Sequence, residues 1–420
     1  MKKLSSLFAL IIALSIITAA FCANAEDEYF SQEQIDYYKS LGLQGTTVNV
    51  YNWGDYISDG SDGSMDVVHE FERLTGAKVN YSNFESNENM YSKLIGGGVS
   101  YDVITPSDYM IERLIDEKLL LPLDFNNIPN FKYISDSCKD LYYDPDNTYS
   151  VGFNTGRTIL IYNTALVKEA PDSWSVLWDE QYKDKVLMFN NSRDAFAIAQ
   201  AVLGQDLNST NEQDWVDAAE LLAKQKDAVN PVYVMDEVFN LMESGEYAFA
   251  TYYAGDFELM IENNSDLAFC FPKEGVNEYW DAFCVPTCAQ NKKGAEAFIN
   301  FMHEPEVAFE NAEYIYYESA NYTVKENEES SFYGSKAIYP EVIPKSQPFK
   351  NLPQNILELQ STLWNQVKGG KLSIKKQKDE RTIYTASAII AIAVVIILFA
   401  AFINKKKKSK EQDLSDLYGK

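Results

Sequence analysis

Histidine and cysteine are scarce in this 420-residue chain, which has two histidines and five cysteines. His69 and His303 are far apart and are flanked by helical patterns, so His69 is expected to be a solvated helix residue. Cys284 and Cys288 do not stand in a zinc-site spacing accompanied by histidines. A zinc centre and a His-dependent catalytic triad are therefore poorly supported, and no cofactor is expected.

Basic residues are also few, with 36 Lys and Arg against 62 Asp and Glu. Residues 26–374 hold 24 of the basic and 57 of the acidic residues, a net charge of −33. Such a field repels nucleic acid, which is not expected as a partner, and attracts cations at a rate that falls with salt. Because solubility alone would explain a net charge, we take it only as a bias toward a cationic ligand.

Uncharged apolar runs stand out near the two ends of the chain. Two lysines, an apolar run over residues 7–20 and the sequence Ala-Asn-Ala at 23–25 predict a signal peptide over residues 1–25. A lipidated Cys22 is an alternative interpretation, but the large Phe21 precedes it where a small residue is favoured. The signal peptide predicts that the following residues are exported.

The second apolar run predicts a single-pass attachment to the cell membrane. Residues 383–403 carry no charge, and at 1.5 Å per residue they span roughly 30 Å, the thickness of a bilayer core. Lysines 405–408 open a basic tail over residues 404–420, which suits the cytoplasm. Residues 368–382 form a linker that is also basic, so the orientation follows from the signal peptide. A buried core helix is the alternative for the apolar run.

About 350 residues lie between these ends, enough for two domains. Strand and helix patterns alternate through them, which predicts a mostly parallel, doubly wound α/β sheet. The expected strands are 48–51, 77–84, 101–104, 186–189, 247–253, 267–271 and 282–285. The expected helices are 32–41, 66–75, 87–95, 108–117, 195–203, 215–225, 236–244 and 293–302. Four cysteines that could form disulfides in an exported protein lie in this part: Cys138, Cys270, Cys284 and Cys288.

Ligands of doubly wound sheets lie beyond the carboxyl ends of the strands. Aromatic, acidic and hydroxyl side chains follow the first three expected strands: Trp53, Asp55, Tyr56, Glu85, Ser107 and Tyr109. Asp108 is expected to be a helix cap, and Glu85 to stabilise its own loop, so both are left out of the ligand set.

Four segments then point to a family: residues 51–56 (YNWGDY), 84–94 (FESNENMYSKL), 101–109 (YDVITPSDY) and 272–275 (PKEG). In these segments, and with gaps from about residue 47 to 368, the chain resembles the spermidine/putrescine-binding proteins of bacterial ABC importers. The resemblance implies a periplasmic-binding-protein-like fold of two lobes, with a polyamine held in the cleft between them and handed to permease subunits. The implied lobes are residues 47–156 with 282–326, and 157–281 with 327–367.

The resemblance also implies a ligand set, carried over position by position. Its aromatic, hydroxyl, amide and acidic members are Trp53, Tyr56, Ser107, Tyr109, Asn191, Asp194, Tyr253, Tyr279, Asp281 and Tyr317. Asn191 stands where the spermidine binder has an aspartate, and Tyr253 and Tyr279 stand where it has tryptophans. A further glutamine of the family has no aligned counterpart, and Gln347 and Asn351 are candidates for it.

A polyamine needs ionised carboxylates for its charges and flat apolar walls for its methylenes, and aromatic rings attract ammonium groups as well. The residues alone leave plainer interpretations open, since Asp194 could serve a helix N-terminus and Asp281 a surface turn. Three other functions remain: a receptor of this fold for another cationic amine, an exported hydrolase and a surface adhesin. No acid/base spacing or nucleophile motif supports an enzyme, so a binding protein is expected.

Overall fold

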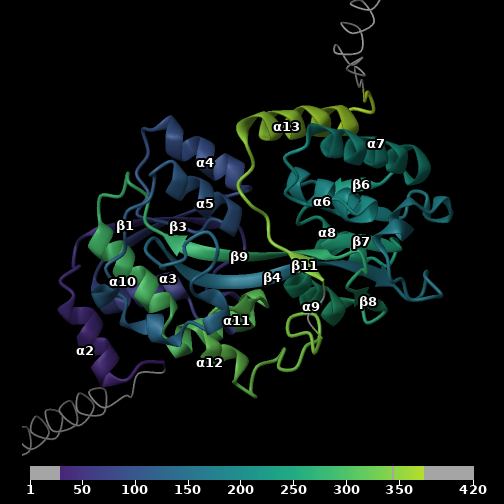
Figure 1. Cartoon of the computed structure of the whole chain (residues 1–420). Coiled ribbons are helices and arrows are strands. Elements are labelled where there is room, and N and C mark those ends of the chain that lie inside the picture. The colour runs from purple at the N-terminus through teal and green to yellow at the C-terminus, as the bar shows by residue number, and fades with distance from the viewer. Residues whose placement is uncertain (1–28, 343–344, 373–420) are drawn as a thin grey trace, which may run out of the picture. The chain divides into compact units, whose positions relative to one another are not determined.

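The computed structural model describes residues 29–342 and 345–372 of the chain (Figure 1). The predicted signal peptide, residues 1–25, and the predicted membrane segment, residues 383–403, lie outside the described residues. Within the described ranges, no helix is both long enough and apolar enough to cross a bilayer.

The strands join into one path in the order β2-β1-β3-β9-β4-β7-β5-β6, with β8 and β10 paired to β4 and β11 paired to β9. Their bounds are β1 (Thr47–Trp53), β2 (Lys78–Phe84), β3 (Val103–Ile104), β4 (Ser150–Asn163), β5 (Val186–Phe189), β6 (Val232–Val234), β7 (Phe249–Tyr253), β8 (Leu267–Cys270), β9 (Val276–Cys284), β10 (Glu318–Ser319) and β11 (Ser346–Gln347).

Strand direction divides this path into three parts. β1 pairs in parallel with β2 and β3, and β5 pairs in parallel with β6 and β7. The centre is antiparallel, because β4 and β9 run in opposite directions and β4 is also antiparallel to β7. The predicted parallel sheet is therefore confirmed at each end and wrong in the centre, where the chain crosses from one end to the other and later returns.

Helices flank the two parallel ends and define two lobes. The first lobe contains β1–β3 with α2 (Gln32–Ser40), α3 (Val67–Thr75), α4 (Asn87–Gly96), α5 (Asp108–Asp116), α10 (Lys292–Met302), α11 (Pro305–Ile315) and α12 (Tyr322–Lys325). The second lobe contains β5–β8 with α6 (Ser192–Leu203), α7 (Glu212–Val229), α8 (Val238–Glu243), α9 (Ala254–Asn263) and α13 (Gln354–Lys368).

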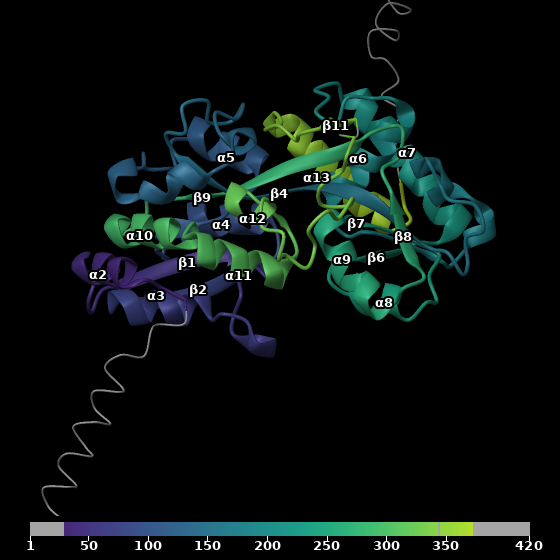
Figure 2. The same cartoon turned by 90° about the horizontal axis from the view of Figure 1, so that it is seen from below.

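The long strands β4 and β9 cross between the lobes, as the two views of Figures 1 and 2 show. β11 runs parallel to β9, and the chain after it leads to α13, which packs on α7. Two of the lobe boundaries predicted from the sequence, after residues 156 and 281, fall inside β4 and β9, and the predicted lobe boundaries remain a prediction.

Capping groups fix the helix ends in the first lobe. The Asp66 carboxylate accepts a hydrogen bond from the backbone N–H of His69 and starts α3, and Gly76 ends it with a φ of 70°. Such a left-handed end favours glycine, because a side chain there would be strained. His69 itself is exposed on α3, as predicted.

Alternating side chains of β1 reach both faces of the sheet in the first lobe. Val48 and Val50 pack in a core with Phe71 of α3, and Tyr51 packs on the other face in a second core. Helices on both faces make this part of the fold doubly wound. Among the residues that the structure describes, Cys138, Cys270, Cys284 and Cys288 form no disulfide.

Candidate functional site

A cavity of about 790 Å³ lies between the lobes and takes its lining from both. All ten residues of the predicted ligand set line it: Trp53, Tyr56, Ser107, Tyr109, Asn191, Asp194, Tyr253, Tyr279, Asp281 and Tyr317. Ligand contact by these residues remains a prediction, but the structure brings every one of them to the same cavity.

The ends of parallel strands place most of these side chains. β1 ends at Trp53, β3 is followed by Ser107 at the start of α5, and β7 ends at Tyr253. Helix α6 begins directly after β5 and contributes Asp194 from its first turn. Carboxyl ends of parallel strands meet at one edge of a sheet, so the two lobes turn their binding edges toward each other.

Asp281 lies in the middle of the site on β9. It is buried, and its Oδ2 accepts a hydrogen bond from the Tyr56 hydroxyl at 2.7 Å. Its Oδ1 is buried with no hydrogen-bond partner among the described residues. Burial raises the pKa of Asp281 to about 6. The interpretation of Asp281 as a surface turn acid is wrong, because the residue lies within a buried strand.

Asp194 is held in the same way in the second lobe. The Tyr253 hydroxyl donates to its Oδ2 at 3.0 Å. A helix N-terminus stabilises a carboxylate, yet burial prevails and raises the pKa of Asp194 to about 7. Asn191 is the N-cap of the helix, and its side-chain oxygen accepts from the backbone N–H of Arg193 at 3.0 Å.

A third pair was not in the predicted set. The Tyr317 hydroxyl donates to Oδ2 of Asp256 on α9 at 2.8 Å, and burial raises the pKa of Asp256 to about 7. Asp236 accepts from Tyr252 at 3.0 Å, so the pattern recurs a fourth time. Asp256 follows the end of β7 just as Asp194 follows β5, and this shared placement was the signal that could have found it.

Ser107 and Tyr109 share one amide partner, Asn87. The Asn87 Nδ2 donates to the Ser107 hydroxyl at 3.0 Å and to the Tyr109 hydroxyl at 3.1 Å. Tyr109 in turn donates to Glu88 at 3.0 Å. Asp108 is the first residue of α5 rather than its cap, and burial raises its pKa well above the ordinary range.

Aromatic rings form the walls of the cavity. Tyr56 and Tyr317 meet edge to face with ring centres 5.1 Å apart, and Tyr253 and Tyr279 do so at 5.5 Å. The Trp53 ring packs on Phe84 at 4.5 Å. Such faces attract cations through their negative quadrupole.

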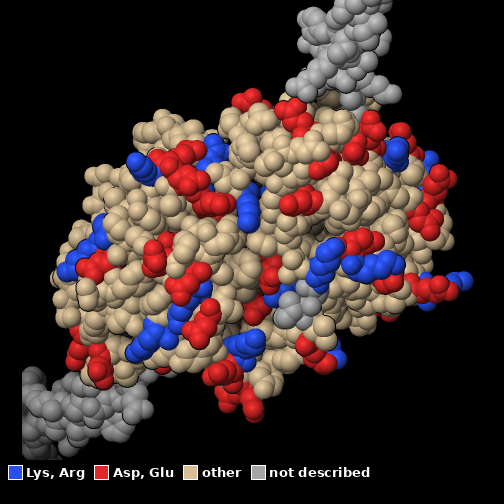
Figure 3. All heavy atoms as spheres, viewed as in Figure 1, with Lys and Arg blue, Asp and Glu red and all other residues tan. Residues whose placement is uncertain are grey.

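Acidic residues outnumber basic residues in the lining of the cavity. Among the described lining residues, Arg193 is the one base, and the acids are Asp55, Glu85, Asp108, Asp194, Asp236, Glu237, Asp256 and Asp281. Arg193 is tied to the Asn208 side chain at 2.7 Å and lies 4.5 Å from the Phe349 ring. On the face seen in Figure 3, by contrast, acidic and basic side chains are interspersed.

The glutamine position suggested by the resemblance is not filled by either candidate. Gln347 bonds to Asp206 at 2.5 Å, and the Asn351 backbone N–H donates to Glu112; neither residue lines the cavity. Phe349, from the same segment, lines it instead.

Known proteins resemble this chain in sequence and in fold. A family model described as bacterial extracellular solute-binding protein matches residues 66–337. The spermidine/putrescine-binding periplasmic protein 1 of Haemophilus influenzae is 32% identical and covers 81% of this chain and 91% of its own length. The putrescine-binding periplasmic protein PotF of Escherichia coli is 28% identical, with coverages of 79% and 94%. A solved structure, a putative spermidine/putrescine ABC transporter from Listeria monocytogenes, is 33% identical with a TM-score of 0.72, with coverages of 77% and 99%.

Proposed function

Because the chain belongs to the bacterial extracellular solute-binding protein family, we propose that it captures spermidine or putrescine outside the cytoplasm and delivers it to the permease of an ABC importer. Relatives named for binding these two polyamines support the ligand class. The chain is a transport protein and not an enzyme.

One observation carries this proposal: buried carboxyl groups, each bonded to a tyrosine hydroxyl, gather around a single cavity. In Asp194, Asp256 and Asp281 the tyrosine uses one carboxylate oxygen, and no hydrogen bond from the described residues reaches the other. Buried carboxylates are unfavourable unless a cation pairs with them. A slender molecule with an ammonium group at each end would supply that charge to two or more of them.

The aromatic walls suit the methylene chain that joins the ammonium groups. Each contact between an ammonium and a ring contributes roughly 0.5–2 kcal/mol, and micromolar affinity needs about 8 kcal/mol. A few carboxylates and rings therefore suffice after ordering costs. We propose that the ten predicted residues contact the ligand, and we add Asp256 to them.

Calorimetric titration with putrescine, spermidine and other amines tests this function. The expected result is saturable binding of putrescine, spermidine or both. Asn191 and the tyrosines at 253 and 279 distinguish the cavity from that of the spermidine binder, so another cationic amine is the second candidate ligand. A heat of binding for such an amine but not for putrescine or spermidine would favour that candidate. If no amine gave a heat of binding, the cation site would be rejected.

We also propose that residues 383–403 anchor the binding lobes to the membrane after removal of residues 1–25. The length and lack of charge of the apolar segment support this attachment. Cell fractionation tests it: the full chain should stay with the membrane, and a chain ending at Gly370 should appear in the medium. Retention of the shortened chain on the cell would contradict the anchor.

A further inference from the structure

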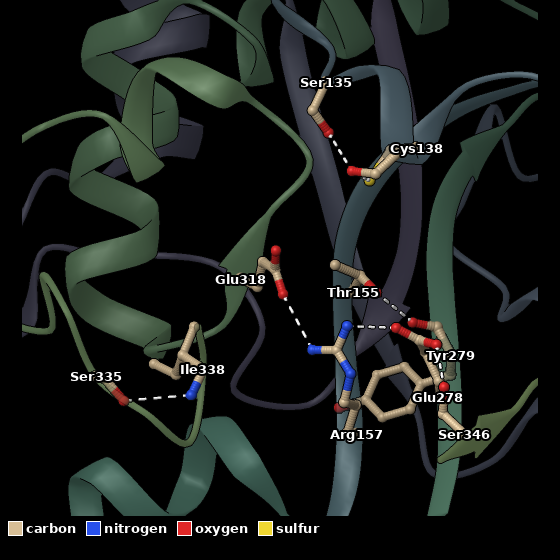
Figure 4. Close-up of polar contacts among 11 residues, drawn as sticks. Ser135, Cys138, Thr155, Arg157, Glu278, Tyr279, Glu318, Ser335, Ile338 and Ser346 are labelled. Carbon is tan, nitrogen blue, oxygen red and sulfur yellow. Dashed lines mark hydrogen bonds and ion pairs between the residues drawn. The ribbon is translucent and has the colours of Figure 1, made fainter. Parts of the chain in front are cut away.

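An arginine on a crossing strand is shared by two carboxylates. Arg157 of β4 forms an ion pair with Glu278 of β9, and its Nη1 lies 3.5 Å from Oε2 of Glu318 on β10. Figure 4 shows its guanidinium between the two carboxylates. Ser346 of β11 donates to the second oxygen of Glu278 at 2.6 Å. The cluster therefore links four strands of the region between the lobes.

Each carboxylate of this cluster is the chain neighbour of a tyrosine in the cavity. Glu278 precedes Tyr279, and Glu318 follows Tyr317. Successive side chains of a strand point to opposite faces. Accordingly, the two tyrosines line the cavity, whereas Arg157, Glu278 and Glu318 do not. Tyr279 lies on β9 and Tyr317 directly precedes β10, so the ion cluster lies on the opposite side of these segments from the cavity.

Close packing makes the tyrosine on β9 sensitive to the alignment of β4 and β9. Gly156, next to Arg157, lies against the ring of Tyr279, and a Cβ at this position would overlap the tyrosine hydroxyl. The Thr155 hydroxyl donates to the Tyr279 carbonyl oxygen at 2.7 Å. A small shift of β9 along β4 would therefore move the ring in the cavity.

The cluster is better suited to fix geometry than to add stability. The Arg157 side chain is 9% exposed, and its partners are 14% and 16% exposed. Desolvation offsets most of the attraction in such buried pairs, so an apolar replacement of the whole set is often neutral. What an apolar set cannot reproduce is the directional fork of the guanidinium, which meets carboxylates from two separate strands.

We propose that Arg157 is a positioning residue that holds Tyr279 and Tyr317 in the geometry needed to grip the ligand, by tying β9 and β10 to β4. This inference rests on the proposed amine-binding function.

The test compares two sets of substitutions in the full chain, purified in detergent. One variant, called the hinge variant because the ion cluster joins strands between the two lobes, carries Arg157→Met, Glu278→Gln and Glu318→Gln, which removes the buried charges together. The control carries Arg73→Met and Glu70→Gln, which removes an ion pair on α3 outside the cavity. Calorimetry gives the dissociation constants for putrescine and spermidine, and stopped-flow fluorescence gives the dissociation rates. Fluorotyrosine NMR reports on the rings of Tyr279 and Tyr317.

The control should bind as the wild type does. The hinge variant should melt close to the wild type yet bind roughly three- to thirtyfold more weakly, dissociate faster and show shifted resonances for both tyrosines. Wild-type affinity and rate in the hinge variant would overturn the proposal. Weaker binding with unmoved tyrosine resonances would overturn it as well, since the rings would not be the intermediary.

Should the hinge variant fail to fold, Arg157→Lys keeps the charge but loses the fork of donors. A weaker affinity in that variant supports positioning, and an unchanged one overturns it. Absence of amine binding by the wild type would overturn the proposed function and the positioning role with it, whereas normal wild-type binding with an unaffected hinge variant would overturn the positioning role alone.

Discussion

The substitution Asp281→Asn should weaken amine binding at least tenfold while the fold stays intact. Asp281 is 4% exposed, and within the described part of the chain only one of its oxygens has a hydrogen-bond partner, the Tyr56 hydroxyl. Asparagine keeps the shape and an acceptor for Tyr56 but removes the charge that an ammonium group would meet. Hydrogen bonds to charged groups contribute about 1.5–3 kcal/mol, which corresponds to roughly 10- to 150-fold in the dissociation constant.

The stability of the ligand-free variant separates a binding role from a structural one. Burial raises the pKa of Asp281 to about 6, so its ionised form destabilises the ligand-free protein by ~3 kcal/mol above that pH. Asparagine removes this term, although its amide nitrogen would lack a partner and offset part of the gain. The free energy of unfolding of ligand-free Asp281→Asn at pH 8 should therefore be no lower than that of the wild type.

Calorimetry with putrescine and spermidine, together with denaturant unfolding, measures both quantities. Asp172→Asn is the matched control, because Asp172 forms an exposed pair with Lys273 outside the cavity. An unchanged dissociation constant in Asp281→Asn would remove Asp281 from the site. A clear loss of stability without ligand would show that Asp281 serves the fold instead.

Four further predictions concern pH and packing. Burial raises the pKa values of Asp194 and Asp256 to about 7, and an ammonium ligand pairs with their ionised forms. The affinity for the amine should therefore rise from pH 5 to pH 7.5, and binding should release protons. A calorimetric heat at pH 6 that does not depend on the buffer would contradict the proton release. The same raised values should lower the free energy of unfolding of the ligand-free protein as the pH rises from about 4 to 7. Burial lowers the pKa of His303 to about 3, and both ring nitrogens lack partners among the described residues. The free energy of unfolding should therefore fall as the pH drops below about 6.5, because the unfolded chain takes up the proton first. In denaturant unfolding, His303→Leu should lose less free energy of unfolding between pH 7.5 and 4.5 than the wild type does, and an equal loss would contradict the prediction. A Cβ at Gly255 would lie 2.5 Å from the Tyr316 carbonyl oxygen and 2.9 Å from Cδ2 of Tyr317, so Gly255→Ala should displace the segment that carries Tyr317, lower the melting temperature and weaken putrescine binding in calorimetry. Wild-type affinity would show that the close approach is not needed for binding.

Helices with distinct ends could be predicted well from the sequence. The expected helix over residues 66–75 is α3, because Asp66 caps one end and Gly76 terminates the other. The short strand over residues 186–189 is β5 as predicted. In both places local composition and the final packing favour the same structure.

The crossing strands could not be predicted, because burial on both faces removes the alternation that marks a strand. β4 was missed entirely, and nearly all of its 14 residues are buried. β9 was expected only over residues 282–285 but begins at Val276. The first part of β9 contains the polar residues Asn277, Glu278 and Asp281, which line the cavity or belong to the ion cluster. They interrupt the apolar pattern from which a strand would be predicted.

Family resemblance selected ten residues that line one cavity, whereas spacing alone left each residue open to plainer interpretations. Asp256, which lines the cavity, was not predicted, although the strand expected before it over residues 247–253 is confirmed as β7. Tertiary contact with Tyr317, which is 61 positions away along the chain, is what gives Asp256 its place in the site. A local sequence pattern cannot predict a contact between residues so far apart in the chain.

A crystal structure of the protein with putrescine or spermidine tests the central claim most directly. The account predicts electron density for the amine inside the cavity between the lobes, with ammonium nitrogens about 3 Å from oxygens of Asp281 and of Asp194 or Asp256, and methylenes against the tyrosine rings. An amine bound elsewhere, or one whose nitrogens meet none of these carboxylates, would contradict it.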